Sequence, residues 1–174
     1  AGEGPVGLES AQQTAEAGVY QGDVIVCCGG GGLSSGIALA LEHDAPGLRV
    51  RTAEPEGFDD AARPVASGEI RSNTAMDGSI CDAIVTPQPG NLTFPILHRL
   101  AGPGFAVSDD DALRAMALAF LRLKVVAEPG GAVALAAALF HPDQIEGDAV
   151  ICTISGGNVD AQLFASALAR YPQG

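Results

Sequence analysis

Four consecutive glycines at positions 29–32 constrain the fold of this chain more than any other feature. They follow an apolar, β-type run at residues 24–28 and precede a helical run at residues 37–41. Glycines leave backbone N–H groups unshielded, and the following helix adds a partial positive charge at its N-terminus. The pattern therefore predicts a strand-to-helix turn that binds a phosphate at the carboxyl edge of a parallel strand, where α/β sheets usually hold ligands.

The spacing of this run excludes two common phosphate motifs. The third glycine of a dinucleotide fingerprint, G-x-G-x-x-G, would fall on Ser34 or Ser35, and no G-K-[ST] of a P-loop follows. A glycine-rich turn without any ligand is the alternative. The length of the run favours a ligand, because each glycine in a regular element costs about 0.5–1 kcal/mol relative to alanine.

Composition limits the size of the fold and the class of partner. The chain has 174 residues, of which 47% are hydrophobic but only 5% aromatic, so we expect one domain with a core of Ala, Val, Leu and Ile. A net charge of −12 disfavours nucleic acid and anionic membranes as partners. Cys27, Cys28 and Cys152 lie in apolar runs without metal-ligand spacing, so we expect buried thiols in a reducing compartment. No signal peptide or membrane span is visible in the sequence, and we therefore expect a cytoplasmic protein.

The remaining chain alternates strand-like and helical patterns, which indicates a parallel α/β sheet. Apolar runs predict strands at residues 48–54 and 105–107 and a buried strand at residues 148–154. Ser108 begins the clearest helix, because Asp111 occupies the capping-box position and the neighbouring acids favour the positive end of the helix dipole. Further helices are expected at residues 5–17, 60–67, 94–100, 131–140 and 159–170.

Several short stretches together resemble one family. They are Gly29-Gly30-Gly31-Gly32-Leu33, Ala53-Glu54-Pro55, Asp59-Asp60, Asp77-Gly78, Pro89-Gly90-Asn91-Leu92-Thr93, residues 125–131, and Ser155-Gly156-Gly157-Asn158-Val159-Asp160. In this order, they resemble the fold-type II pyridoxal-phosphate enzymes of the threonine/serine dehydratase and serine racemase branch. The resemblance implies an α/β fold of the tryptophan synthase β-like class, a three-layer α/β/α arrangement with a mostly parallel sheet flanked by helices.

The resemblance covers the C-terminal half of that family only. It begins at residues 1–4, which match a mid-chain stretch, and it implies that residues 1–174 are the C-terminal part of the large domain. The N-terminal half, which carries the Schiff-base lysine, is then absent from this chain. Lys124 is the only lysine, and it matches a non-catalytic position. We therefore expect half of a cofactor site, which requires the missing half for activity, and a homodimeric full-length protein.

The resemblance assigns residues to pyridoxal 5'-phosphate. Ser155 would face the pyridine nitrogen, while Glu128 and Gly156 would lie just behind the site. Without the family match, a hydroxyl that caps the following helix is an equal alternative for Ser155, and a structural acid before Pro129 is an alternative for Glu128. The phosphate would be held by Gly29, Gly30, Gly31, Gly32 and Leu33.

A divalent-cation site is the second site that the resemblance implies. The family's ligand spacing falls on Glu54, the backbone carbonyl of Phe58, and Asp60. Hard oxygen ligands of this kind suit Mg²⁺, Ca²⁺ or Mn²⁺. An acidic, solvated loop is the alternative, because Glu56 and Asp59 also lie there.

The favoured function is β-elimination from a β-hydroxy amino acid such as threonine, serine or 3-hydroxyaspartate, which yields a 2-oxo acid and ammonia. A serine- or aspartate-type amino-acid racemase of the same fold is the close alternative. A non-catalytic phosphate- or effector-binding domain is the third, because this chain has no lysine placed for a Schiff base.

Overall fold

A parallel sheet forms the centre of the protein in the computed structural model, which describes residues 3–59 and 78–173. Within these residues the sheet has four strands in the order β3-β2-β1-β4. They are β1 (Gly22–Cys27), β2 (Leu48–Pro55), β3 (Phe105–Val107) and β4 (Val150–Cys152). All three strand pairings are parallel, and Cys27 of β1 pairs with Ala53 of β2 near the carboxyl edge.

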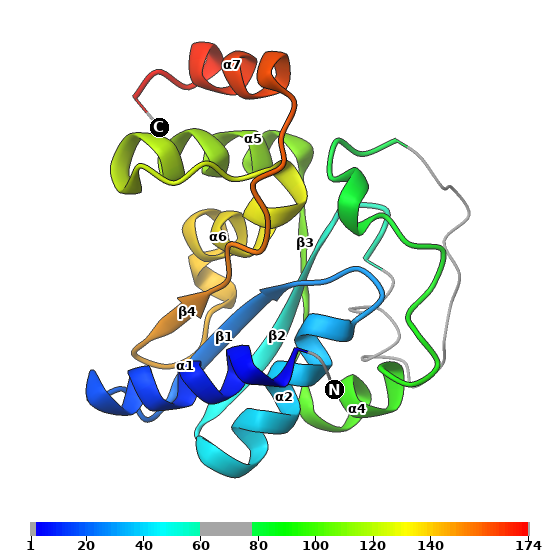
Figure 1. Ribbon diagram of the computed structural model, residues 1–174, viewed down its shortest axis with the longest axis vertical. Helices are drawn as coiled ribbons and strands as arrows, with labels where there is room; N and C mark the ends of the chain where they lie inside the picture. Colours follow the sequence, from blue (N-terminus) through cyan, green and yellow to red (C-terminus); the bar gives the residue numbers. More distant parts are fainter. Residues whose placement is uncertain (1–2, 60–77, 174) are drawn as a thin grey trace.

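Helices cover both faces of this sheet (Figure 1). On one face, α1 (Gly4–Glu16) and α2 (Gly32–Asp44) contribute to a cluster that includes Val24 and Val26 of β1. On the other face, α5 (Asp109–Leu118) and α6 (Pro129–Phe140) contribute to a cluster that includes Ile25 of β1. The helix α4 (Phe94–Leu100) contacts α2, and α7 (Ala161–Arg170) contacts α5. This arrangement confirms the predicted three-layer α/β/α architecture.

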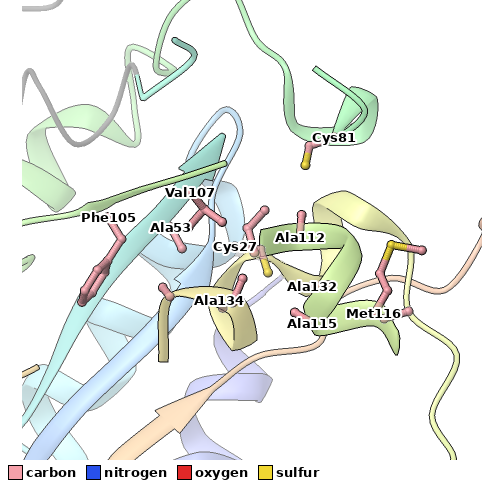
Figure 2. Close-up of a cluster of buried hydrophobic side chains, with 14 of the residues drawn as sticks. Cys27, Ala53, Cys81, Phe105, Val107, Ala112, Ala115, Met116, Ala132 and Ala134 are labelled. Carbon is pink, nitrogen blue, oxygen red and sulfur yellow. The ribbon is translucent and has the colours of Figure 1, made fainter. Parts of the chain in front are cut away.

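The layer around α6 shows how a chain with few aromatics fills its core. Most of α6 is alanine, glycine and valine, and eight of its twelve residues are buried. Small side chains let α6 lie close to the sheet and to α5, and Figure 2 shows Ala132 and Ala134 of α6 with Ala115 and Met116 of α5. Because this helix is apolar on every side, burial explains its sequence better than amphipathic patterning does.

Several element boundaries differ from those that the sequence predicts. The predicted buried strand at residues 148–154 is only three residues long, and Val150 is 41% exposed because β4 lies at the end of the described sheet. After α5 the chain widens into a π-helical turn (Ala119–Leu123), which ends at Lys124 with a φ of 61°. Short 3₁₀ helices occur at Asp82–Ile84 and Pro142–Gln144. The helix predicted at residues 60–67 lies outside the described residues.

A buried ion-pair network joins the amino ends of β1 and β2. The Asp23 carboxylate accepts hydrogen bonds from Arg51 Nη1 at 2.8 Å, Arg49 Nη2 at 3.1 Å and the Glu146 N–H at 3.0 Å. Arg51 is itself buried and donates to the Pro103 carbonyl. Burial opposes ionisation of Asp23, but these hydrogen bonds outweigh it and hold the pKa of the carboxyl below its ordinary value.

No helix in the described ranges combines the length and apolar character that a membrane crossing requires.

Candidate cofactor site

The glycine run and Ser155 line one cavity of about 220 Å³ at the carboxyl ends of β1 and β4. The cavity lies where the sequence predicts a ligand, at the carboxyl edge of a parallel sheet. The structure thus brings together all six residues that the sequence assigns to the cofactor. Its lining consists of Cys27, Cys28, Gly29, Gly30, Gly31, Gly32, Leu33, Ser34, Ala83, Ile84 and Ser155.

Two of the four glycines are required by the chain itself. Gly31 has a φ of 84°, a left-handed conformation that side chains rarely adopt, and a Cβ there would lie 2.9 Å from Thr93 Oγ1. A Cβ on Gly29 would lie 3.2 Å from the Cα of Ile84. At Gly30 and Gly32, by contrast, a Cβ would meet no atom within 4 Å. These two glycines therefore face open space, as expected where a ligand approaches the backbone.

The N-terminus of α2 lies at the cavity, and its first N–H groups have no acceptor within the helix. The N-cap residue here, Gly31, has no side chain that could accept from them. The side chain of Ser34 in the first turn is fully buried, and its Oγ has no hydrogen-bond partner among the described residues. An unsatisfied buried hydroxyl costs about 1–3 kcal/mol. A phosphate at the helix N-terminus would satisfy these donors, so the residues present fit such a group.

Any electrostatic attraction of the cavity for an anion comes from backbone dipoles, because no charged side chain lines its described part. The lining residues that the structure describes include no lysine, arginine, histidine or carboxylate. Lys124 lies elsewhere, where it is exposed and donates to the Leu121 carbonyl at 2.8 Å. In a chain with a net charge of −12 and a lining of this kind, an anion would be bound by backbone N–H groups and the helix dipole. The described part of the cavity can bind and orient a group, but it holds no strong acid or base.

The turn that carries Ser155 is fixed by the start of α6. The Ser155 N–H donates to the Gly131 carbonyl at 3.3 Å, and the Glu128 N–H donates to the Gly156 carbonyl at 3.0 Å. A Cβ on Gly156 would lie 2.0 Å from Glu128 Oε1, so the Glu128 carboxylate lies directly against this glycine. Glu128 and Gly156 do not line the cavity, and they contact each other next to the turn that carries Ser155.

Two cysteines, Cys27 and Cys28, line the cavity next to the glycines. The four cysteines of the chain are all described and form no disulfide. Cys27 donates through Sγ to the Gly131 carbonyl at 3.3 Å, which links β1 to the start of α6. Burial raises the pKa of the Cys81 thiol to about 12, so this group stays protonated at neutral pH. Cys27 and Cys28 are buried, as the sequence predicts, whereas Cys152 in the end strand β4 is only partly buried.

The predicted metal site lies only partly within the described residues. Glu54, near the end of β2, is fully buried, and Phe58 is also buried and donates its N–H to the Pro55 carbonyl at 3.0 Å. Asp60, the third expected ligand, lies outside the described residues. Within the described ranges, no group of three His, Cys, Asp or Glu side chains is placed to hold a metal ion. The site stays a prediction.

Comparisons with known proteins identify the family. A family described as pyridoxal-phosphate dependent enzyme matches residues 1–157. The chain belongs to this family of pyridoxal-phosphate dependent enzymes. It is 37% identical over 168 residues to a serine racemase of Oryza sativa subsp. indica, with 91% of this chain and 47% of the relative covered. It is 38% identical over 163 residues to the catabolic L-threonine dehydratase TdcB of Escherichia coli (strain K12), with 92% and 48% covered.

Solved structures agree with the fold. The crystal structure of a threonine deaminase from T.th. superposes with a TM-score of 0.86 and 38% sequence identity, covering 91% of this chain and 58% of that one. This match confirms the expected tryptophan synthase β-like class of fold. The chain spans about half the length of the curated relatives it matches.

Sequence reasoning missed three contributors to the site. Ser34 could have been suspected because it is a hydroxyl in the first turn after the glycines. The 3₁₀ segment Asp82–Ile84 supplies Ala83 and Ile84 to the lining, and nothing in its pattern indicates that position. Thr93 contacts the glycine loop from outside the cavity, although the resemblance had singled out its stretch without a role.

Proposed function

We propose that the full-length protein is a pyridoxal-phosphate-dependent ammonia-lyase that removes water from a β-hydroxy amino acid. Threonine, serine or 3-hydroxyaspartate would yield a 2-oxo acid and ammonia. The observation that carries the proposal is the cavity in which the glycine run, the N-terminus of α2 and Ser155 meet, in a chain of this family. Relatives named threonine dehydratase and threonine deaminase support the elimination.

The residues of this chain would bind and orient the cofactor. The N–H groups of residues 29–33 and the hydroxyl of Ser34 would hold its phosphate, and Ser155 at the opposite side would hydrogen-bond the ring nitrogen. Pyridoxal phosphate supplies the electron sink that stabilises negative charge at the substrate Cα. Because a serine hydroxyl is a very weak acid, it would leave the ring nitrogen without a proton. A sink of modest strength suits the rapid loss of a β-hydroxyl group.

We propose further that residues 1–174 form the C-terminal part of the large domain. The support is that the relatives are about twice as long as the matched stretch. An N-terminal half would supply the lysine that bonds the cofactor and the groups that bind the substrate carboxylate. By the same resemblance, the full-length protein would be a cytoplasmic homodimer.

An amino-acid racemase is the second candidate, and the serine racemase relative favours it specifically. The two reactions share the loss of the Cα proton and differ in the next step. A racemase returns a proton to the opposite face of Cα, which needs a second acid, whereas a lyase expels the β-hydroxyl. A non-catalytic phosphate- or effector-binding role remains the third candidate, since no lysine lines the described cavity.

We also propose a divalent cation at Glu54, the Phe58 carbonyl and Asp60. The support is the buried carboxylate of Glu54 beside a loop with further acids, a setting that oxygen-preferring Mg²⁺, Ca²⁺ or Mn²⁺ would suit. Adding each ion to chelator-treated full-length protein should raise its unfolding temperature. The variant Glu54→Gln should abolish that rise, and a rise that persists in the variant would place the ion elsewhere.

The decisive experiment is an absorbance spectrum of the purified full-length protein before and after borohydride. An absorbance band that borohydride removes irreversibly, with the cofactor retained on the protein, would establish a lysine-bound pyridoxal phosphate. Release of a 2-oxo acid from serine, threonine or 3-hydroxyaspartate would then favour the lyase, and formation of a D-amino acid would favour the racemase. A protein that binds no cofactor when it is added would refute both and leave the phosphate-binding role.

A further inference from the structure

A segment outside the cavity holds the carbonyl group of Gly30. Thr93 Oγ1 lies 2.6 Å from the Gly30 oxygen, and the Gly90 N–H donates to the same oxygen at 3.2 Å. Thr93 Oγ1 also lies 3.1 Å from the Gly90 oxygen, which makes the segment of residues 90–93 compact. Neither Gly90 nor Thr93 lines the cavity. The glycine loop is thus fastened at its centre by residues that do not line the cavity.

This attachment determines where the next N–H group points. In a trans peptide unit, the C=O of Gly30 and the N–H of Gly31 point in opposite directions. A carbonyl held toward residues 90–93 therefore turns the Gly31 N–H away from that segment, which does not line the cavity, whereas Gly31 does. Because glycine peptides rotate with little steric resistance, an unfastened Gly30–Gly31 unit would adopt several orientations.

The glycine loop and the segment of residues 90–93 lie so close together that only glycine fits at positions 31 and 90. A Cβ on Gly31 would lie 2.9 Å from Thr93 Oγ1 and 3.0 Å from Leu97 Cδ1. A Cβ on Gly90 would lie 2.9 Å from Thr93 Oγ1 and 3.1 Å from the Gly30 oxygen. Thr93 is the N-cap residue of α4, and Leu97 anchors that helix because it is fully buried. The glycine loop is therefore braced against a helix that packs on α2.

We propose that Thr93 is a positioning residue whose hydroxyl holds the Gly30–Gly31 peptide so that its N–H is aimed at the cofactor phosphate. The inference rests on the proposed function, since it needs a phosphate in the cavity. The hydroxyl would contact no cofactor atom itself, and it would orient the Gly31 N–H through the Gly30 carbonyl that it holds. Loss of one such hydrogen bond should weaken phosphate binding by about 2- to 10-fold.

The test compares two cofactor forms in the full-length apoprotein. Thr93→Val keeps the shape of the side chain and removes the hydroxyl, whereas Thr93→Ser keeps the hydroxyl. Each protein is titrated with pyridoxal 5'-phosphate and with pyridoxal, which has no phosphate, and the Kd is measured by absorbance. We expect Thr93→Val to raise the Kd for pyridoxal 5'-phosphate by about 2- to 10-fold and to leave the Kd for pyridoxal unchanged. Thr93→Ser should bind as the wild type does.

Thr14 offers a matched control. Its hydroxyl also lies near backbone carbonyls, 2.8 Å from that of Ser10 and 3.1 Å from that of Ala11, but it lies within α1 and away from the cavity lining. Thr14→Val should leave both dissociation constants unchanged. If Thr93→Val does not fold, as judged by thermal unfolding of the apoprotein, Thr93→Ala provides the same test without the added methyl group.

The possible failures are distinguishable. A wild-type protein that does not bind pyridoxal 5'-phosphate overturns the proposed function and the role of Thr93 with it. Wild-type binding with an unchanged Thr93→Val overturns only the role of Thr93. The same holds if Thr93→Val weakens pyridoxal equally, or if Thr93→Ser fails to restore affinity, because either result would indicate a general structural contribution.

Discussion

Alanine at two adjacent glycines should separate the fold of the loop from its ligand binding. Gly31 has a φ of 84°, which costs an alanine about 1–2 kcal/mol, and the contact of its Cβ with Thr93 Oγ1 at 2.9 Å adds to this. Gly32 is the first residue of α2, and a Cβ there would meet no atom within 4 Å, so Gly32→Ala should be neutral or stabilise by about 0.4–1 kcal/mol. The unfolding free energy of each variant in urea gives the comparison.

Binding of pyridoxal 5'-phosphate should be sensitive to Gly32→Ala, although folding tolerates this change. In a helix the Cα–Cβ bond tilts toward the N-terminus, so an alanine Cβ at position 32 would point toward the cavity that Gly32 lines. Displacing one phosphate contact of about 1.5–3 kcal/mol should raise the Kd for pyridoxal 5'-phosphate by about 10- to 150-fold. A Gly32→Ala protein that binds as tightly as the wild type would refute a phosphate at this helix end. Destabilisation equal to that of Gly31→Ala would refute the distinction between the glycines.

Four further experiments test other parts of the structure. Ser34→Ala removes a buried hydroxyl without a partner among the described residues, so the apoprotein should gain about 1–3 kcal/mol of stability in urea unfolding while its affinity for pyridoxal 5'-phosphate falls. Asp23→Ala leaves Arg51 buried without its carboxylate partner and should cost about 3–5 kcal/mol in thermal unfolding. In the wild type the pKa of Asp23 is lowered, so its contribution is complete above the ordinary value of 3.8 and should disappear as the pH falls below that value in acid titrations of stability. Cys81, whose thiol has a pKa of about 12, should resist alkylation at pH 8 in the folded protein and react in urea, as mass spectrometry would report.

The central part of the fold could be predicted from the sequence because its signals are local. The run from β1 through the glycines into α2 contains its own apolar residues, its own turn and its own helix start. Ser108 caps α5 by accepting from the Asp111 N–H at 3.1 Å, as expected from residues three positions apart. Such features need no knowledge of distant segments, and the structure reproduces them.

The errors arise where position in the fold decides the outcome. The run Val150-Ile151-Cys152 is as apolar as β1, so its pattern favours a buried strand, but β4 has a strand partner on one side only within the described sheet. Whether a strand is central or at an edge depends on which segments lie beside it, and the local sequence does not contain that information. The π-helical turn after α5 is a similar case, because its residues are ordinary helix formers.

The site shows the same division between local and long-range information. The glycine run predicts an anion site by itself, whereas the hydrogen bond from Thr93 to Gly30 joins residues 63 positions apart. Ser34 is a different case, because only the three-dimensional structure shows that its buried hydroxyl has no hydrogen-bond partner among the described residues. Sequence reasoning therefore finds the groups that touch the ligand more readily than the groups that hold them in place.

The acidity of the chain gives the glycine loop a particular physical role. A net charge of −12 repels an anionic cofactor at long range, and the lining of the described cavity has no basic side chain to offset that repulsion. In the described part of the site, attraction then comes from N–H groups at hydrogen-bonding distance, which salt screens little compared with exposed charges. Added salt should therefore speed the association of pyridoxal 5'-phosphate by screening the repulsion, whereas dissociation should change little. A salt-dependent increase in the dissociation rate would instead indicate that charged side chains hold the phosphate.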